Sequence, residues 1–312
     1  STAAFAALLA ACSQPQPAES LTRWVDPKIG TGGHGHVFVG ANVPFGLVQV
    51  GPTSIPQEWD WVSGYHASDS TVIGFSHTHL SGTGIGDLFD VTLMPVVGEV
   101  VYARGTEEDP ASGLWSYADR TKEVVRPGYY SVPLVRYGVK AEMTATSRVG
   151  LHRYTFPAAE DAAVVFDLEN GGCWDKATET HLEQLDERTI AGWRYSTGWA
   201  KDQRVYFVAE FSKPFAKFET VGEHYGRASF TTTDAEQLLV KVALSPVSLE
   251  GARANLAAEL PGWDFEAVAA AADAAWNEEL SRVKISTPDE TAKRIFYTAL
   301  YHTMVAPSEF CD

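Results

Sequence analysis

The sequence predicts a mainly β protein, in which a large antiparallel β-sandwich is followed by helices. From about residue 22 to 247, short apolar runs with strand periodicity alternate with turn signals rich in Gly and Pro. After Pro246 the apolar residues change to helical spacing. Many strands without intervening helices favour antiparallel pairing over a βαβ fold.

Four segments carry the strand prediction. Apolar residues alternate from Val135 to Ala145, which predicts a half-buried strand with a bulge at Gly138. The run at 162–168 is apolar except at Asp167 and is predicted to be buried on both faces. Two further strands are predicted at residues 205–211 and 238–244, with turns at 126–128 and 170–172.

Three helices are predicted in the last part of the chain. Ser248 can cap a short helix that ends at Leu260. A second helix has its apolar residues on one face: Phe265, Val268, Ala269, Ala272, Trp276, Leu280 and Val283. A capping box at Thr287, with Pro288 as the first helical residue, opens a third helix that is predicted to run to Ala306.

The first twenty residues are predicted to be targeting material. An apolar stretch ends in Leu9-Ala-Ala-Cys12, which resembles a bacterial lipobox. Cys12 would then be the lipidated residue, and the Pro- and Gln-rich stretch after it a tether. The alternative is a disordered terminus with an accidental cysteine.

Composition narrows the classes of function. A net charge of -16 argues against nucleic acids and anionic membrane surfaces and disfavours phosphorylated substrates. Three cysteines are too few for a disulfide framework, and no apolar run reaches the ~20 residues of a transmembrane helix.

Two segments rich in Gly and His are the most informative motifs. The first extends from Gly30 to Ala41 and contains His34 and His36, and the second extends from Gly74 to Asp87 and contains His77 and His79. Histidines two apart on a strand point to one face, so with Asp87 and Asp90 they can supply metal ligands. They can equally be buried and bonded to the backbone, or donate to sugar hydroxyls.

Trp59 and Trp61 flank Asp60 between these segments, in a polar stretch punctuated by Pro and Gly. An indole can cover the apolar face of a pyranose while its N–H remains free to hydrogen-bond. Burial in the core is the alternative for both tryptophans.

Several blocks closely resemble glycoside hydrolase family 92. They are residues 26–36, Val43-Pro-Phe-Gly46, Trp61-Val-Ser-Gly-Tyr-His66, the segment 74–87, Leu93-Met-Pro95 and residues 296–307. The resemblance implies an exo-α-mannosidase, calcium-dependent and inverting, that trims mannose from N-glycans, with α-1,2 linkages as the first expectation. It also implies that the catalytic acid, the base and the calcium ligands lie beyond Asp312, in an (α/α)6 barrel that is truncated here.

The resemblance and the change after Pro246 together divide the chain. The expected parts are a lipoprotein signal and tether (1–20), an N-terminal β-sandwich (21–247), linker helices (248–286) and the start of the catalytic domain (287–312).

The sandwich is expected to form the substrate-binding wall of an active site, in a protein anchored by lipid in the bacterial cell envelope. The fragment alone is expected to be inactive. The expected substrate-binding residues are Trp59, Trp61, His34, His36, His77, His79 and Asp87. A carbohydrate-binding sandwich without catalysis and a His-rich metallohydrolase remain the alternatives.

Overall fold

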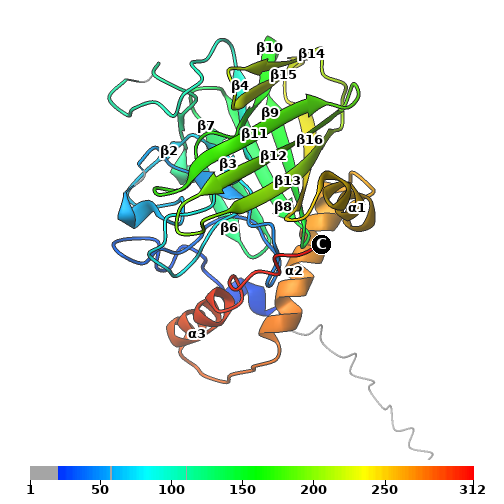
Figure 1. Ribbon diagram of the computed structural model, residues 1–312. Coiled ribbons are helices and arrows are strands. Elements are labelled where there is room, and N and C mark those ends of the chain that lie inside the picture. The colour runs from blue at the N-terminus through cyan, green and yellow to red at the C-terminus, as the bar shows by residue number, and fades with distance from the viewer. Residues whose placement is uncertain (1–19, 57, 110) are drawn as a thin grey trace, which may run out of the picture.

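The computed structural model describes residues 20–56, 58–109 and 111–312, and its centre is a two-sheet antiparallel β-sandwich (Figure 1). The prediction for Cys12 and the tether therefore lies outside the described residues. Among the described helices, none combines the length and the apolar character that a membrane span needs.

The first sheet has six strands in the order β1-β3-β4-β10-β15-β14. Its strands are β1 (Gly51–Thr53), β3 (Gly74–Ser76), β4 (Thr92–Val97), β10 (Ala159–Asp167), β15 (Tyr225–Thr232) and β14 (Lys217–Val221). The predicted strand at 162–168 is β10, and its residues from Ala162 onward are fully buried. This strand lies in the middle of the sheet, between β4 and β15.

The second sheet has eight strands in the order β11-β12-β13-β16-β9-β8-β7-β6. Its strands are β11 (Lys176–Gln184), β12 (Thr189–Thr197), β13 (Gln203–Phe211), β16 (Glu236–Ser245), β9 (Val149–Phe156), β8 (Val139–Ala145), β7 (Tyr129–Leu134) and β6 (Val124–Arg126). The predicted strands at 205–211 and 238–244 are confirmed as β13 and β16. A small separate sheet pairs β2 (Thr71–Val72) with β5 (Ser116–Tyr117).

The strand predicted from Val135 to Ala145 is wrong at its beginning. Leu134 of β7 pairs with Val139 of β8, so the residues between them form a hairpin turn. Val135 is exposed, and Gly138 has a φ of 63° in this turn rather than at a bulge. Val135 and Tyr137 continue the alternation by chance, and periodicity alone does not separate a strand from a tight turn inside an apolar run.

Three α-helices follow the last strand: α1 (Leu249–Glu259), α2 (Phe265–Leu280) and α3 (Glu290–His302). Three short 3-10 helices, η1 (Leu21–Trp24), η2 (Trp59–Trp61) and η3 (Arg120–Lys122), lie earlier in the chain. Ser248 caps α1 as predicted, because its side chain accepts from the N–H of Gly251. The predicted apolar face of α2 is buried except at Val268, which is partly buried, and Val283, which is exposed.

The third helix begins and ends differently from the prediction. Its N-cap is Asp289, whose carboxylate accepts from the N–H of Ala292, and Thr287 lies outside it. The helix ends at His302 instead of continuing to Ala306, and Met304 and Val305 turn back into the apolar core.

The helices share apolar cores with the rest of the chain. The start of α2 and all of α1 cover the outer face of the eight-stranded sheet, where Val149, Val208 and Ala243 are buried beneath them. Further along, Trp276 and Tyr301 pack with Leu21, Trp24 and Phe38 from the beginning of the chain, and this cluster lies below the sandwich in Figure 1. The predicted linker is therefore part of the packed structure around the sandwich.

Candidate functional site

Trp59 stands at the centre of an exposed group that joins the two Gly- and His-rich segments. Its ring is 49% exposed and lies on His34 and His36, with ring centroids 5.1 and 4.4 Å away. Its Nε1–H donates to the carbonyl oxygen of Gly84 at 3.2 Å. A Cβ at residue 84 would lie 2.6 Å from that Nε1, so glycine is needed for the indole to come so close.

Asp60 connects the same two histidines. Its Oδ1 accepts from Nδ1 of His34 at 2.6 Å, and Nε2 of His36 lies 3.5 Å from the same oxygen without making a hydrogen bond. The bond from His34 lowers the pKa of the Asp60 carboxyl. We call His34, His36, Trp59, Asp60 and Gly84 the Trp59 cluster.

Only part of the Trp59 cluster can touch a ligand. His34 and Trp59 are exposed and Asp60 is partly so, which places an apolar ring face beside an imidazole and a carboxylate. His36 is buried, so it supports the indole from below rather than contacting a substrate as expected. This arrangement can bind a molecule that has both apolar C–H faces and hydroxyl groups.

Trp61 is held more firmly than Trp59. Its Nε1–H donates to Oδ2 of Asp69 at 3.0 Å, and its ring lies 4.6 Å from that of His66. The indole is partly buried and its N–H is already bonded. The two tryptophans of the same short helix η2 therefore differ, and Trp59 is the better candidate for contact with a ligand.

His77 lies in the core, which contradicts its expected contact with substrate. Its Nδ1 donates to the carbonyl oxygen of Val91 at 2.5 Å, so in the neutral ring Nε2 is an acceptor. Nε2 of His152, 2.8 Å away, then carries a proton and donates to it, and Nδ1 of His152 accepts from the hydroxyl of Tyr154 at 2.8 Å. Burial lowers the pKa of His77 to about 4 and that of His152 well below its usual value.

His79 is also a core residue. Its Nδ1 donates to the carbonyl oxygen of Gln49 at 2.7 Å, and its ring packs between Phe38 and Phe89. Burial lowers the pKa of His79 to about 3. For this second pair, the interpretation as buried, backbone-bonded histidines is the one that fits.

Asp87 holds a loop and does not face a ligand. It is buried, and its two oxygens accept from the backbone N–H groups of Trp199 at 2.9 Å and Ala200 at 2.8 Å. The expected contact of Asp87 with substrate is therefore replaced by a structural role. Its effect on the surface is indirect, because it positions the exposed side chain of Trp199.

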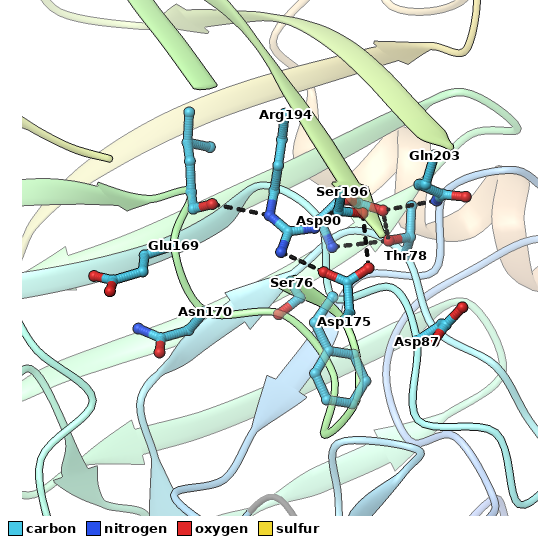
Figure 2. A network of polar contacts seen from close by, with 12 residues as sticks. Ser76, Thr78, Asp87, Asp90, Glu169, Asn170, Asp175, Arg194, Ser196 and Gln203 are labelled. Carbon is cyan, nitrogen blue, oxygen red and sulfur yellow. Dashed lines mark hydrogen bonds and ion pairs between the residues drawn. The ribbon is translucent and has the colours of Figure 1, made fainter. Parts of the chain in front are cut away.

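Asp90 belongs to a buried ion-pair network and is itself fully buried (Figure 2). Arg194 donates to Oδ1 of Asp90 at 2.7 Å and also to Asp175, while its Nε donates to the carbonyl oxygen of Leu168 at 2.9 Å. Both carboxylates are bonded further, Asp90 to Thr78 and Asp175 to Ser196. Burial raises the pKa of Asp175, which opposes the stabilising effect of Arg194.

The two histidine pairs do not form a metal site. Among the residues that the structure describes, no three His, Cys, Asp or Glu side chains come together in a way that could hold a metal ion. Cys173 is also unsuited to nucleophilic chemistry, since partial burial raises the pKa of its thiol.

Two exposed tryptophans were not found by sequence reasoning. Trp174 is 46% exposed and Trp199 is 72% exposed. Both lie in polar stretches that contain glycine, at residues 171–175 and 197–202, as Trp59 and Trp61 do. Both are attached to the second Gly- and His-rich segment, since Trp174 N–H donates to the carbonyl oxygen of Gly86 at 2.8 Å and Trp199 is held by Asp87.

Comparison with family models matches two parts of the chain. Residues 24–245 match the glycosyl hydrolase family 92 N-terminal domain, and residues 251–312 match the glycosyl hydrolase family 92 catalytic domain.

Solved structures of family 92 α-mannosidases have the same fold. One from Bacteroides thetaiotaomicron is 36% identical, with a TM-score of 0.88 over 94% of this chain and 42% of its own. Its complex with mannoimidazole gives 36% identity and a TM-score of 0.87 over 93% of this chain and 40% of that one. An inverting mannosidase from the same organism is 26% identical, with a TM-score of 0.80 over 95% of this chain and 41% of its own.

A curated relative from Arthroderma benhamiae is described as an uncharacterized secreted glycosidase. It is 26% identical over 92% of this chain and 42% of its own length. The chain thus spans about 42% of the length of this relative and of the α-mannosidase described first.

Proposed function

The chain belongs to glycosyl hydrolase family 92, and from this premise we propose that it is the N-terminal part of an exo-α-mannosidase. The Trp59 cluster would form the part of the active-site wall that this sandwich contributes. Two observations support the proposal. Structural relatives are named α-mannosidases, one of them bound to mannoimidazole. The exposed face of the Trp59 ring, called the Trp59 face below, lies beside His34 and Asp60.

The Trp59 face is the observation that carries the proposal. An exposed indole fixed by a backbone carbonyl presents one rigid apolar surface, against which the C–H face of a pyranose can stack. The imidazole of His34 and the carboxylate of Asp60, which are bonded to each other, stand beside this face and can also bond ring hydroxyls. Holding the sugar in one orientation lowers the barrier to reaction without any reacting residue on this wall.

The reacting carboxylates are proposed to come from the catalytic domain, whose model matches residues 251–312. An inverting glycosidase needs two carboxyl groups ~6.5–9.5 Å apart with a water molecule between them. Asp87 and Asp90 are unsuited because they are buried and fully engaged in bonds to the protein. Asp69 is likewise buried and bonded to Trp61.

Calcium dependence and inversion follow from the family resemblance, as do α-1,2 linkages of N-glycans as substrate. The described residues do not fit a calcium site, because no three acidic or other ligating side chains among them come together. The proposal therefore gives these residues no part in binding the ion.

The decisive experiment measures hydrolysis of 4-nitrophenyl α-mannoside by the longest gene product that contains this chain. Trp59→Ala is expected to lower kcat/KM at least about tenfold, which corresponds to about 1.4 kcal/mol of lost stabilisation. Its melting temperature should stay close to that of the parent, because the ring is half exposed. NMR should detect β-mannose as the first product, and a chelator should abolish turnover. Residues 20–312 alone should not hydrolyse the substrate.

Tyr117→Ala is the matched control, since Tyr117 is an exposed aromatic residue on the separate small sheet. If Trp59→Ala behaves like this control in kcat/KM, the Trp59 face is not part of the active site. Binding of mannose without any turnover would instead identify a carbohydrate-binding module.

Secretion and lipid anchoring are proposed from the apolar stretch before Cys12, and the secreted relative supports the former. In a Gram-negative host the protein should fractionate with membranes, and Cys12→Ser should move it to the soluble fraction. A wild-type protein found only in the soluble fraction, with residues 1–11 retained, contradicts the lipobox.

A further inference from the structure

The exposed tryptophans of the described chain are all attached to one short segment, residues 84–87. Trp59 donates from its indole to Gly84, Trp174 donates from its backbone to Gly86, and Trp199 donates from its backbone to Asp87. No other tryptophan in the described ranges is classed as exposed. Since an extended residue spans at most about 3.6 Å, the Cα atoms of Gly84 and Asp87 lie within roughly 11 Å of each other.

The loops that carry Trp174 and Trp199 also contact each other. A Cβ at Gly198 would lie 3.2 Å from the carbonyl oxygen of Trp174, so the two backbones are packed together. They belong to the end of the sheet where β11 begins, β12 ends and β13 begins, on the left in Figure 1. Neither indole makes a ring contact with another aromatic side chain among the described residues, so both project from fixed backbones as free surfaces.

A polar hollow of about 340 Å³ adjoins Trp174. Cys173 and Asp175, on either side of this tryptophan, both line it, and its other charged or polar lining residues are Arg104, Glu169, Asn170, Lys176 and His224. Neither Arg104 nor Lys176 makes a side-chain hydrogen bond or an ion pair within the ranges the structure describes. Trp174 itself does not line the hollow, but its two neighbours do, so free hydrogen-bond donors lie next to the loop that carries this exposed indole.

We propose that Trp174, Trp199 and this hollow form a second carbohydrate subsite, which binds the part of a glycan that extends away from the mannose at Trp59. The inference rests on the proposed function, because it places the cleaved sugar at the Trp59 cluster. Glycan chains present repeated apolar faces and hydroxyl edges, and the surface provides indoles for the former and cationic donors for the latter.

The charged residues around the two indoles favour a glycan over a packed domain as the occupant. Lys176, Lys201 and Asp202 are exposed next to Trp174 and Trp199. The interior of an interface between packed domains is depleted of charged residues, because their desolvation is unfavourable. A glycan site tolerates such groups at its edge, where they remain in water while their donors reach hydroxyl oxygens.

The test compares a short and a long substrate with the longest gene product that contains this chain. Trp174→Ala and Trp199→Ala are each expected to raise KM for a mannopentaose about five- to tenfold. KM for 4-nitrophenyl α-mannoside, which reaches only the Trp59 cluster, should stay within about twofold of the parent value. Tyr117→Ala should alter neither constant, and the melting temperatures of both tryptophan variants should stay close to that of the parent.

Two outcomes overturn the subsite. One is an unchanged KM for the mannopentaose in both variants. The other is an equal loss on both substrates together with a lower melting temperature, which would mean that the indoles pack against another part of the protein.

Failure of the proposed function is a separate result. If the protein hydrolyses no α-mannoside, calorimetric titration with the mannopentaose still decides the subsite. Binding that is lost in Trp174→Ala and Trp199→Ala supports it, and binding that both variants retain, or an absence of binding, overturns it.

Discussion

Nε2 of His152 donates to Nε2 of His77 over 2.8 Å, between two side chains that are fully buried in the sandwich. Both nitrogens of each ring make hydrogen bonds. Only one arrangement of protons satisfies these bonds, and both rings are neutral in that arrangement. The pair therefore joins the strand β9 of one sheet to the segment that follows β3 of the other.

Acid should destabilise the fold through this pair. The folded pKa of His77 is about 4, below the unfolded value of 6.5, so the unfolded chain binds more protons in this range. The contribution of His77 to the free energy of unfolding is fully present above pH 6.5. About 3 kcal/mol of this contribution is lost as the pH falls towards 4. Urea unfolding at a series of pH values measures this slope.

The control for the acid effect is a variant that leaves both buried histidines in place. Tyr117→Ala, which removes an exposed side chain on the small separate sheet, should leave the slope between pH 6.5 and 4 unchanged, whereas His77→Asn should reduce it. Equal slopes in the parent and in a folded His77→Asn variant would show that the pair is not the source.

Arg194→Met should be strongly destabilising. It leaves the carboxylates of Asp90 and Asp175 buried without their shared cation, and breaking a buried pair in this way costs about 3–5 kcal/mol. Adding Asp90→Asn and Asp175→Asn to the same variant removes the stranded charges and should recover part of the loss. Unfolding midpoints of the single and triple variants test this, and a triple variant no more stable than the single one contradicts the explanation.

Gly86→Ala should disturb the loop that carries Trp174. A Cβ at residue 86 would overlap Sγ of Cys173, and the carbonyl of the same residue accepts from Trp174. The substitution should therefore lower the melting temperature, and adding Cys173→Ala, which removes the sulfur, should restore part of it. Cys173→Ala alone is the control, and an additive effect of the two changes would mean that they are not in contact.

Trp276→Ala should cost about 3–5 kcal/mol, because it empties a fully buried site and breaks a hydrogen bond from Nε1 to the carbonyl oxygen of Asn42 at 2.7 Å. Trp59→Ala makes the same chemical change at an exposed site and should cost little. The difference between their urea midpoints measures how strongly the helices are joined to the beginning of the chain. Similar midpoints would show that α2 contributes little to the stability of the sandwich.

Most of the fold was predictable because long strands and helices repeat one local pattern. The strand at 162–168 and the helix capped by Ser248 are examples, and both predictions are confirmed. The turn after Leu134 and the end of α3 were missed, because there the apolar pattern continues while the backbone changes direction.

The site was only partly predictable for a different reason. His34 and His77 occur in similar motifs, yet one is exposed and the other is buried, since burial depends on which strands pair across the sandwich. Asp87 meets the loop of Trp199 across 112 residues of sequence, a contact that no local pattern contains.

The positions of the loops that carry Trp174 and Trp199 do not depend on which side chains these two residues have. Both residues are held through their main-chain N–H groups, which every amino acid except proline possesses. Other side chains can therefore replace these two indoles while the loops keep their shape. Trp59 is different, because its own indole makes the attachment, so that replacing it also removes the hydrogen bond to Gly84. The surface thus has one position that depends on its side chain and two at which the side chain can change by single substitutions that leave the loop attachments intact.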